Sequence, residues 1–195
     1  LSKLITKKML SSLNFDVITA YTLEEAKRYL DQKEKIFVAL LDLNLPDAPN
    51  GEVVDIMKAY KIPSIVLTGS MDKEVREQIL KKEVIDYVYK GNIDDVNYIF
   101  TLIERLHKNR DIKVMIVDDS VTVRKVTSRL LERQGYEVVT AKDGVDAVEQ
   151  LENIHPDLML LDIEMPRMDG FEVCRKLKEE AATRHIPVVM VDRKS

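Results

Sequence analysis

Two apolar segments of the chain end in acidic residues. Residues 114–117 are followed by Asp118 and Asp119, and residues 158–161 are followed by Asp162. Neighbouring parallel strands bring their carboxyl ends to one edge of a sheet, so we expect the three carboxylates to converge there. Carboxylates without a cationic partner repel one another, and burial raises the cost. A hard cation such as Mg²⁺ resolves the conflict, and a metal beside an aspartate is a setting for phosphoryl transfer.

Each acidic motif has an ordinary structural interpretation when it is taken alone. An Asp-Asp-Ser sequence after a strand is most often a helix N-cap cluster. Asp162 stands before a loop with proline and glycine, where aspartate is a common turn former. The order and spacing of the two motifs, with a helix-strand-helix pattern between them, favour one shared site over two independent turns.

The segments around these acids resemble the receiver domain of bacterial two-component response regulators. "VMIVDDSVTVRKVTSRLLERQGYEVVTAKDGVDAVEQL" is similar to the first half of that domain, and "PDLMLLDIEMPRMDGFEVCRKL" is similar to its phosphorylation strand and loop. By this resemblance, Asp118 and Asp119 hold Mg²⁺ together with Asp162, which is the phosphoacceptor. Glu164 would add its backbone carbonyl to the metal. The resemblance covers residues 112–191.

The same pattern occurs earlier in the chain, which indicates a tandem repeat. "LSSLNFDVITAYTLEEAKRYL" aligns without gaps with "LERQGYEVVTAKDGVDAVEQL". "FVALLDLNLPDAPNGEVVDIM" then aligns with "DLMLLDIEMPRMDGFEVCRKL", which places Asp42 opposite Asp162 and Asn44 opposite Glu164.

The first copy continues into two further segments of the receiver pattern. "IPSIVLTGS" resembles the fourth strand of the domain, and "VIDYVYKG" resembles the fifth. The resemblance implies that Asp42 is a second phosphoacceptor, that the Thr68 hydroxyl contacts a phosphoryl oxygen and that Lys90 supplies a cation. Thr68 and Tyr87 would form the switch, because Tyr87 stands where receivers carry the aromatic residue that turns inward on activation. Taken alone, Thr68 would be an ordinary turn residue and Lys90 a solvated strand end.

The first copy is expected to lack its opening strand in this sequence. Extending the ungapped match backwards sets Leu1 opposite Thr122. The equivalents of Asp118 and Asp119 therefore fall upstream of residue 1. On these residues alone, the first site cannot hold its metal.

The second copy is expected to lack its C-terminal part. "HIPVVMV" aligns with "KIPSIVL", which sets Asp192 opposite Thr68, and the sequence ends at Ser195 without a fifth strand, lysine or final helix. A carboxylate at the hydroxyl position would repel a phosphoryl group. Either this receiver is degenerate there, or an unrepresented loop lies between Val191 and Asp192, and we favour the second interpretation.

Hydrophobic periodicity alternates between helix and strand through both copies. Strands of Val, Ile and Leu with little alternation suit parallel sheets that are covered on both faces. We therefore expect an α/β fold with two flavodoxin-like (βα)5 receiver domains, residues 1–110 and 111–195, whose sheets have the strand order 2-1-3-4-5. Strands are expected near residues 15–20, 36–41, 64–67, 85–89, 113–117, 136–141, 158–161 and 187–191. Helices are expected near residues 3–13, 23–31, 52–60, 73–82, 93–108, 121–133, 144–153 and 170–179.

Composition excludes several other classes of protein. The 195 residues are 45% hydrophobic and 33% charged, which is typical of globular domains. A net charge of −4 gives no electrostatic reason to expect direct nucleic-acid binding. The single cysteine, Cys174, excludes an intrachain disulfide. No segment is apolar enough to predict a membrane span, so we expect a cytoplasmic protein.

The resemblance implies a phosphorylation-controlled signalling switch. A sensor histidine kinase or phosphotransfer protein would donate a phosphoryl group to Asp162, and to Asp42 in an intact first domain. The shift in conformational population would then be read by an output domain or partner protein. A diguanylate cyclase outside this chain is one such output, and a homodimer is one assembly that the sequence leaves open.

Two alternatives belong to other functional classes. The Asp162-x-Glu164 spacing suggests an aspartyl-phosphate hydrolase of the haloacid dehalogenase type. That family, however, requires an aspartate two residues after its nucleophile and has no preceding Asp-Asp pair. A phosphorylation-independent receiver scaffold is favoured if Asp192 is a true substitution.

Overall fold

The chain divides into two α/β units. The structure, a computed structural model, describes residues 15–32, 35–69, 72–91 and 93–192, and the helix expected near residues 3–13 lies outside them. Unit 1 comprises residues 1–104 and unit 2 comprises residues 105–195. Each unit has its own sheet, and every strand pair in both sheets is parallel. Among the described residues, no helix combines the length and apolar character that crossing a membrane requires.

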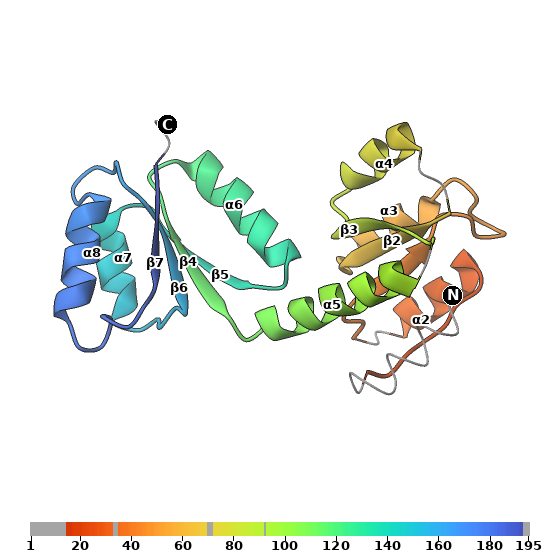
Figure 1. Cartoon of the computed structure of the whole chain (residues 1–195), viewed down its shortest axis with the longest axis horizontal. Helices are drawn as coiled ribbons and strands as arrows, with labels where there is room; N and C mark the ends of the chain where they lie inside the picture. The colour runs from red at the N-terminus through yellow and green to blue at the C-terminus, as the bar shows by residue number, and fades with distance from the viewer. Residues whose placement is uncertain (1–14, 33–34, 70–71, 92, 193–195) are drawn as a thin grey trace. The chain divides into compact units, whose positions relative to one another are not determined.

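Among the described residues of unit 1, the sheet contains three strands in the order β1-β2-β3 (Figure 1). All five residues of the central strand β2 are buried, as expected for a parallel strand that is covered on both faces. The order corresponds to strands three, four and five of the predicted sheet. The described elements from residue 23 onward are α2 Leu23–Asp31, β1 Ala39–Asp42, α3 Glu52–Ala59, β2 Ser64–Thr68, α4 Lys73–Leu80, β3 Asp86–Tyr89 and α5 Ile93–Asn109.

The strand predicted near residues 15–20 is wrong, because these residues have no strand assignment. The predicted order would pair this segment with the opening strand of the domain. The described part of unit 1 contains no strand between it and β1, so its backbone groups have no ladder to join. The ring of Phe15 instead stacks on Phe37, with ring centroids 5.5 Å apart.

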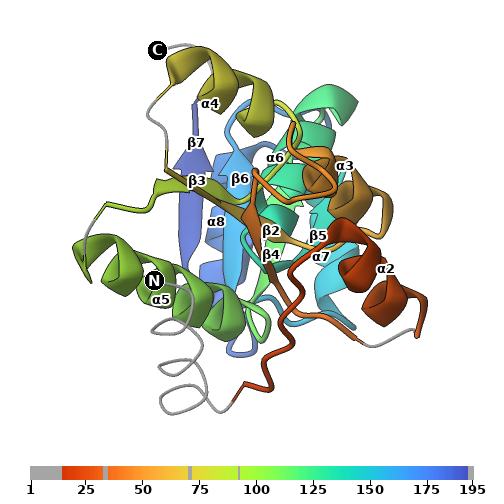
Figure 2. The ribbon, with the colours of Figure 1, turned by 90° about the vertical axis from the view of Figure 1, so that its right-hand side faces the viewer.

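Helices cover both faces of the unit 1 sheet. Figures 1 and 2 both show α4 and α5 on opposite faces of this sheet. Val66 packs in a core cluster with residues of α2, α3 and α4. Alternation along β2 turns its neighbours Ile65 and Leu67 to the other face, and both are buried there. The inner side of α5 is buried at Val96, Ile99 and Ile103.

In the part of unit 2 that the structure describes, the sheet contains four strands in the order β5-β4-β6-β7. In sequence order within the unit, this arrangement is 2-1-3-4, which confirms the predicted flavodoxin-like topology for the strands that are described. The elements are β4 Lys113–Val117, α6 Val121–Arg133, β5 Glu137–Ala141, α7 Gly144–Leu151, β6 Leu158–Asp162, α8 Gly170–Glu179 and β7 Val188–Val191.

The core of unit 2 lies between the sheet and helices α7 and α8. Met115 and Val117 of β4, together with Met159 and Leu161 of β6, pack against Val173 of α8 in one buried cluster. Figure 1 shows α7 and α8 on one face of the sheet and α6 on the other. None of the residues of α6 is buried. The site-bearing strands β4 and β6 therefore rest on a well-packed layer on the α7–α8 side.

Gly170 lets helix α8 begin directly against strand β6. Its N–H donates to the Ile163 carbonyl at 3.0 Å, and a Cβ added here would lie 2.4 Å from the Asp162 carbonyl oxygen. Asp169 and Glu172 form a capping box that starts the helix at this point. The loop after Asp162 is thus closed by a residue that has no room for a side chain.

Gly170→Ala should lower the free energy of unfolding of unit 2 by about 1–3 kcal/mol, because the added methyl group overlaps backbone atoms that belong to β6. Urea unfolding followed by circular dichroism measures the change. Gly69→Ala is the matched control, since a Cβ added at Gly69 meets nothing within 4 Å. Equal effects of the two substitutions would show that the close approach at Gly170 has no energetic consequence.

Candidate functional site

Three aspartates converge at the carboxyl edge of the unit 2 sheet. Asp118 and Asp119 follow β4, and Asp162 is the last residue of β6. These strands are neighbours, with Val117 paired to Leu161. One carboxylate oxygen from each of the three aspartates lies within 4.8 Å of the others. The structure therefore brings together the three acids that the sequence predicted to meet.

Local hydrogen bonds determine the position of the first acid. The Ser120 N–H donates to Asp118 Oδ1 at 2.7 Å, and the Ser120 side chain caps α6 by accepting from the Val123 N–H. Arg124, one turn into the helix, donates from Nη1 to the Asp118 carbonyl oxygen at 2.5 Å. The chain thus turns from strand to helix within three residues, and Asp118 is held at the turn. The N-cap interpretation of this motif is correct, and it coexists with the acidic cluster.

Burial makes the cluster electrostatically costly. Asp118 and Asp162 are each 3% exposed, whereas Asp119 is exposed. Buried carboxylates close to one another disfavour a shared ionised state unless a cation compensates them. Carboxylate oxygens that meet from three directions are the donor set that Mg²⁺ and other hard cations accept. The residues present therefore fit a divalent cation.

Glu164 lies in the loop between β6 and α8. It is exposed, two residues after Asp162. The next residue, Met165, is buried in the unit 2 core, which ties this part of the loop to the body of the unit. The metal-binding role of the Glu164 carbonyl stays a prediction.

Unit 1 has a different arrangement at the same edge of its sheet. Asp42 ends β1, Thr68 ends β2, and Lys90 follows β3. Lys90 Nζ forms an ion pair with Asp42 Oδ2, and the Lys90 N–H donates to the Thr68 carbonyl at 2.7 Å. The structure brings these three predicted residues to neighbouring strand ends. Within its described residues, unit 1 contains no group of three acids comparable to the cluster in unit 2.

Comparison with known proteins identifies the family. The sequence-family model described as the response regulator receiver domain matches residues 114–195. A solved structure of a two-component system response regulator/GGDEF domain protein aligns with 97% of this chain and 76% of its own, at 33% identity and a TM-score of 0.80. The chain belongs to the response regulator family. Receiver domains of this family are phosphoacceptor switches rather than enzymes.

Two curated response regulator relatives cover the second copy. Protein PilG of Pseudomonas aeruginosa is 41% identical over 83 residues, which are 43% of this chain and 62% of PilG. Response regulator PleD of Caulobacter vibrioides is 46% identical over 79 residues, which are 40% of this chain and 17% of PleD. The chain thus spans less than two thirds of the length of either relative.

Strand register supports the match between Asp192 and Thr68 in this response regulator. Asp42 pairs with Leu67, and Asp162 pairs with Val191. The next residue is Thr68 in unit 1 and Asp192 in unit 2. Thr68 is buried and Asp192 is exposed. Unit 2 therefore has an exposed carboxylate where unit 1 has a buried hydroxyl.

Tyr87 belongs to the buried core cluster of unit 1. The residue is 9% exposed, and its hydroxyl is buried without a hydrogen-bond partner among the described residues. A buried hydroxyl without a partner costs roughly 1–3 kcal/mol. The switch role of Tyr87 stays a prediction.

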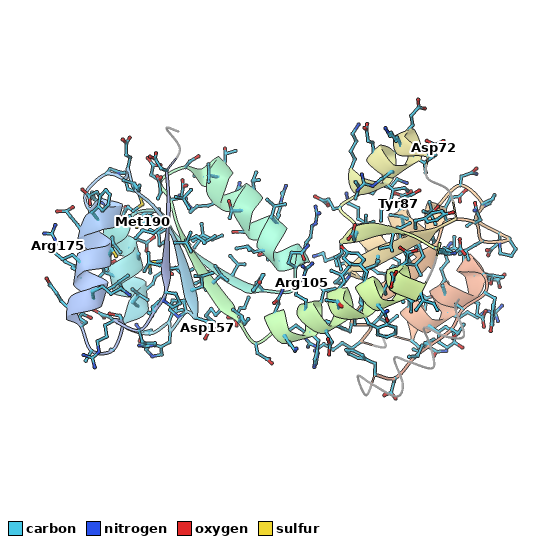
Figure 3. All side chains as sticks on the ribbon, viewed as in Figure 1. Asp72, Tyr87, Arg105, Asp157, Arg175 and Met190 are labelled. Carbon is cyan, nitrogen blue, oxygen red and sulfur yellow. The ribbon has the colours of Figure 1, made fainter. Side chains whose placement is uncertain are left out.

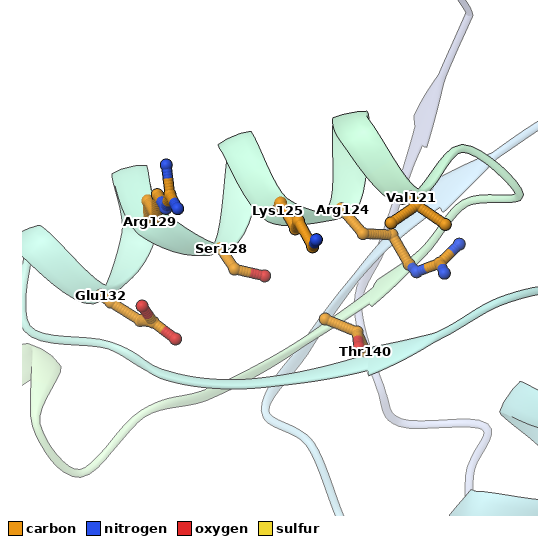
Figure 4. A pocket seen from close by; sticks show the side chains of 7 residues that line it. All are labelled: Val121, Arg124, Lys125, Ser128, Arg129, Glu132 and Thr140. Atoms are coloured by element: carbon orange, nitrogen blue, oxygen red, sulfur yellow. The ribbon is translucent and has the colours of Figure 1, made fainter.

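A pocket of about 350 Å³ lies between α6 and β5 in unit 2 (Figure 4). Arg124, Lys125 and Arg129 give its lining a basic character. None of the predicted site residues lines it. The chemistry expected of a receiver is therefore assigned to the acidic cluster and not to this pocket.

Sequence reasoning missed two polar contacts next to these sites. In unit 2, Arg167 forms an ion pair with Asp143. In unit 1, Asp47 accepts hydrogen bonds from the backbone at the start of α2. The repeat alignment places Asp47 opposite Arg167 in two otherwise similar loops, but it does not predict either contact.

Tyr87→Phe should raise the free energy of unfolding of unit 1 by about 1 kcal/mol, because it removes a buried hydroxyl that has no partner. Thermal and urea unfolding measure the effect. Tyr89→Phe is the control on the same strand, since Tyr89 is 38% exposed and should change stability little. A destabilising effect of Tyr87→Phe would mean that the hydroxyl contributes a favourable interaction.

Proposed function

We propose that this chain is a phosphorylation-controlled signalling switch with two receivers, residues 1–110 and 111–195. Asp162 accepts a phosphoryl group from the phosphohistidine of a sensor histidine kinase or a phosphotransfer protein. The observation that carries this proposal is the convergence of Asp118, Asp119 and Asp162 within 4.8 Å at one sheet edge. Family membership supplies the reaction class, and this cluster supplies the residues.

In the second receiver, Asp118, Asp119 and Asp162, with the Glu164 carbonyl, would hold Mg²⁺. The ion would supply positive charge that offsets the carboxylates and the negative charge of the incoming phosphoryl group. The Asp162 carboxylate forms the new O–P bond as the N–P bond to the donor histidine breaks. Asp162 is buried at the end of a paired strand, which restricts the positions open to its carboxylate and would reduce the entropic cost of the transfer. Glu164 would lean over the transferred group from the loop.

In the first receiver, Asp42 is the proposed phosphoacceptor. The Lys90 ammonium already pairs with the Asp42 carboxylate, so it is placed to contact a phosphoryl oxygen once the aspartate is modified. Thr68 ends the neighbouring strand and offers its hydroxyl to the same group. Thr68 and Tyr87 would form the switch that transmits the change to the receiver surface.

A phosphorylation-independent scaffold is the second candidate, and one observation in each unit favours it. Asp192 is exposed at the position that would otherwise offer a hydroxyl. Asp42 has no cluster of three acids among the described residues of its unit. A receiver with either feature would bind partners without switching.

The output and the partners of the whole protein are also part of the proposal. The GGDEF domain named with the similar solved structure supports a diguanylate cyclase as the output that the receivers control. A cytoplasmic location fits a histidine kinase or phosphotransfer protein as donor. A homodimer is the assembly through which such an output would be regulated.

Incubation of the chain with Mg²⁺ and acetyl phosphate should add a base-labile phosphoryl group to Asp162, because an aligned carboxylate with a bound metal supplies most of what the transfer requires. Intact-mass measurement before and after mild alkali detects the group. Asp162→Asn should abolish it in the second receiver, and Asp42→Asn should leave that label unchanged. Persistence of the label in Asp162→Asn, with peptide mapping that also excludes Asp42, would contradict the assignment.

A further inference from the structure

The fifth residue after each proposed phosphoacceptor makes a contact that the repeat alone does not predict. This residue is Asp47 in unit 1 and Arg167 in unit 2, and each directly follows a proline. Both lie in the loop that runs from the phosphoacceptor strand to the next helix. Both side chains reach back to the start of the preceding helix, α2 or α7.

In unit 2 the contact is an ion pair on a buried acid. Arg167 Nε donates to Asp143 Oδ2 at 3.0 Å, and Arg167 Nη2 donates to the same oxygen. Asp143 is 4% exposed and is the N-cap of α7, where its Oδ1 accepts from the Asp146 N–H at 3.0 Å. Arg167 holds this position with a φ of 70°, a left-handed conformation that costs energy for a side-chain-bearing residue. The ion pair therefore constrains the loop at an unfavourable backbone conformation.

The ionisation of Asp143 supports the contact. Burial raises the pKa of Asp143, but the hydrogen bond from Arg167 and the N–H of Asp146 outweigh burial and hold that pKa below its ordinary value. Asp143 is therefore charged at neutral pH. A buried charge of this kind depends on its partner, so removal of the guanidinium leaves the acid uncompensated.

In unit 1 the same two segments meet through different atoms. Asp47 Oδ1 accepts from the Leu23 N–H at 2.8 Å, and Oδ2 accepts from the Glu24 N–H at 2.9 Å. These are the first two residues of α2, whose N-terminal amides attract a carboxylate. The two backbone hydrogen bonds lower the pKa of Asp47 below its ordinary value. The N-cap itself is Thr22, which the repeat alignment places opposite Asp143.

The loop and the helix start are in close contact in unit 2. A Cβ added at Gly144, the first residue of α7, would lie 2.6 Å from the Met168 carbonyl oxygen and 2.4 Å from Val173 Cγ2. Met168 follows Arg167 directly. The ion pair thus lies beside a backbone contact that leaves no space for the loop to move toward the helix.

We infer that Asp47 and Arg167 are positioning residues, which hold the loop after each phosphoacceptor against the start of the preceding helix. Asp47 and Arg167 occupy equivalent positions but carry opposite charges. The N-cap residue that Asp47 lies beside is the neutral Thr22, whereas the N-cap residue that Arg167 contacts is the buried carboxylate Asp143. In unit 2 the anchored loop carries Glu164. The consequence for metal binding and phosphorylation rests on the proposed function, whereas the anchoring of the loop does not.

Each unit combines one positioning residue with one N-cap residue. Transferring the combination of unit 1 into unit 2 therefore tests the inference. Arg167→Asp places a second carboxylate beside buried Asp143 and should release the loop. The double variant Asp143→Thr with Arg167→Asp reproduces the Thr22 and Asp47 combination of unit 1 and should restore the anchor. Arg175→Ala is the matched control, because Arg175 is exposed on the outer side of α8 (Figure 3).

Hydrogen–deuterium exchange of residues 163–169 in the chain is the first readout. Arg167→Asp should speed exchange there, and the double variant and Arg175→Ala should exchange as the wild type does. Calorimetric titration with Mg²⁺ is the second readout. Arg167→Asp should weaken Mg²⁺ binding about tenfold through the displaced loop, as loss of groups that orient metal ligands commonly does. Electrostatics alone predicts tighter Mg²⁺ binding, since the variant replaces a positive charge with a negative one.

Unchanged exchange in Arg167→Asp, or a double variant no better than the single one, would overturn the inference. If Arg167→Asp does not fold, Arg167→Ala and Asp47→Ala test the same point, through exchange of residues 163–169 and 43–50. Failure of wild-type chain to bind Mg²⁺ would count against the proposed function. The exchange measurements would then still decide whether Asp47 and Arg167 anchor their loops.

Discussion

Repulsion among Asp118, Asp119 and Asp162 is the constraint on which the rest of unit 2 depends. Two unit charges about 4 Å apart near a protein surface interact by roughly 4 kcal/mol. Parallel pairing of β4 with β6 forces the three acids to one edge, and core packing of Met115, Val117, Met159 and Leu161 fixes the strands that carry them. The fold therefore stabilises an arrangement that the acids alone would disfavour. A bound cation, as proposed for this site, would offset the repulsion.

The two units meet the same electrostatic problem in different ways. In unit 1 a single carboxylate, Asp42, is compensated inside the protein by Lys90. In unit 2 the described residues present three carboxylates together and place exposed Asp192 at the end of the neighbouring strand. Unit 1 thus displays the groups that would respond to a phosphoryl group, and unit 2 displays those that would assist its transfer. The loop after each proposed phosphoacceptor contacts the start of the preceding helix in both units, through Asp47 and through Arg167.

Much of this arrangement could be predicted from the sequence because it depends on backbone pairing. Apolar runs such as residues 114–117 and 158–161 predict strands, and their parallel order alone brings the acids after them to one edge. The strand expected near residues 15–20 failed because a strand exists only with a partner, and the described part of unit 1 offers none there. The hydrophobic periodicity of one segment does not show whether a partner strand is present beside it.

Side-chain contacts between distant segments were harder to foresee. The ion pair between Asp143 and Arg167 joins residues 24 positions apart, and nothing in either local sequence requires it. The Tyr87 hydroxyl, which has no hydrogen-bond partner among the described residues, likewise depends on how residues of α2, α3 and α4 pack in one cluster with Tyr87. Both features follow from packing geometry, whereas the acidic cluster follows from topology.

The thermal stability of unit 2 with and without Mg²⁺ tests the central claim most directly. At a concentration tenfold above its dissociation constant, Mg²⁺ should stabilise the unit by about 1.4 kcal/mol through ligand linkage. Asp119→Asn should remove most of this gain, and because Asp119 is exposed, the substitution leaves the core intact. Equal melting temperatures in Mg²⁺ and in chelator for the wild-type chain would contradict the account.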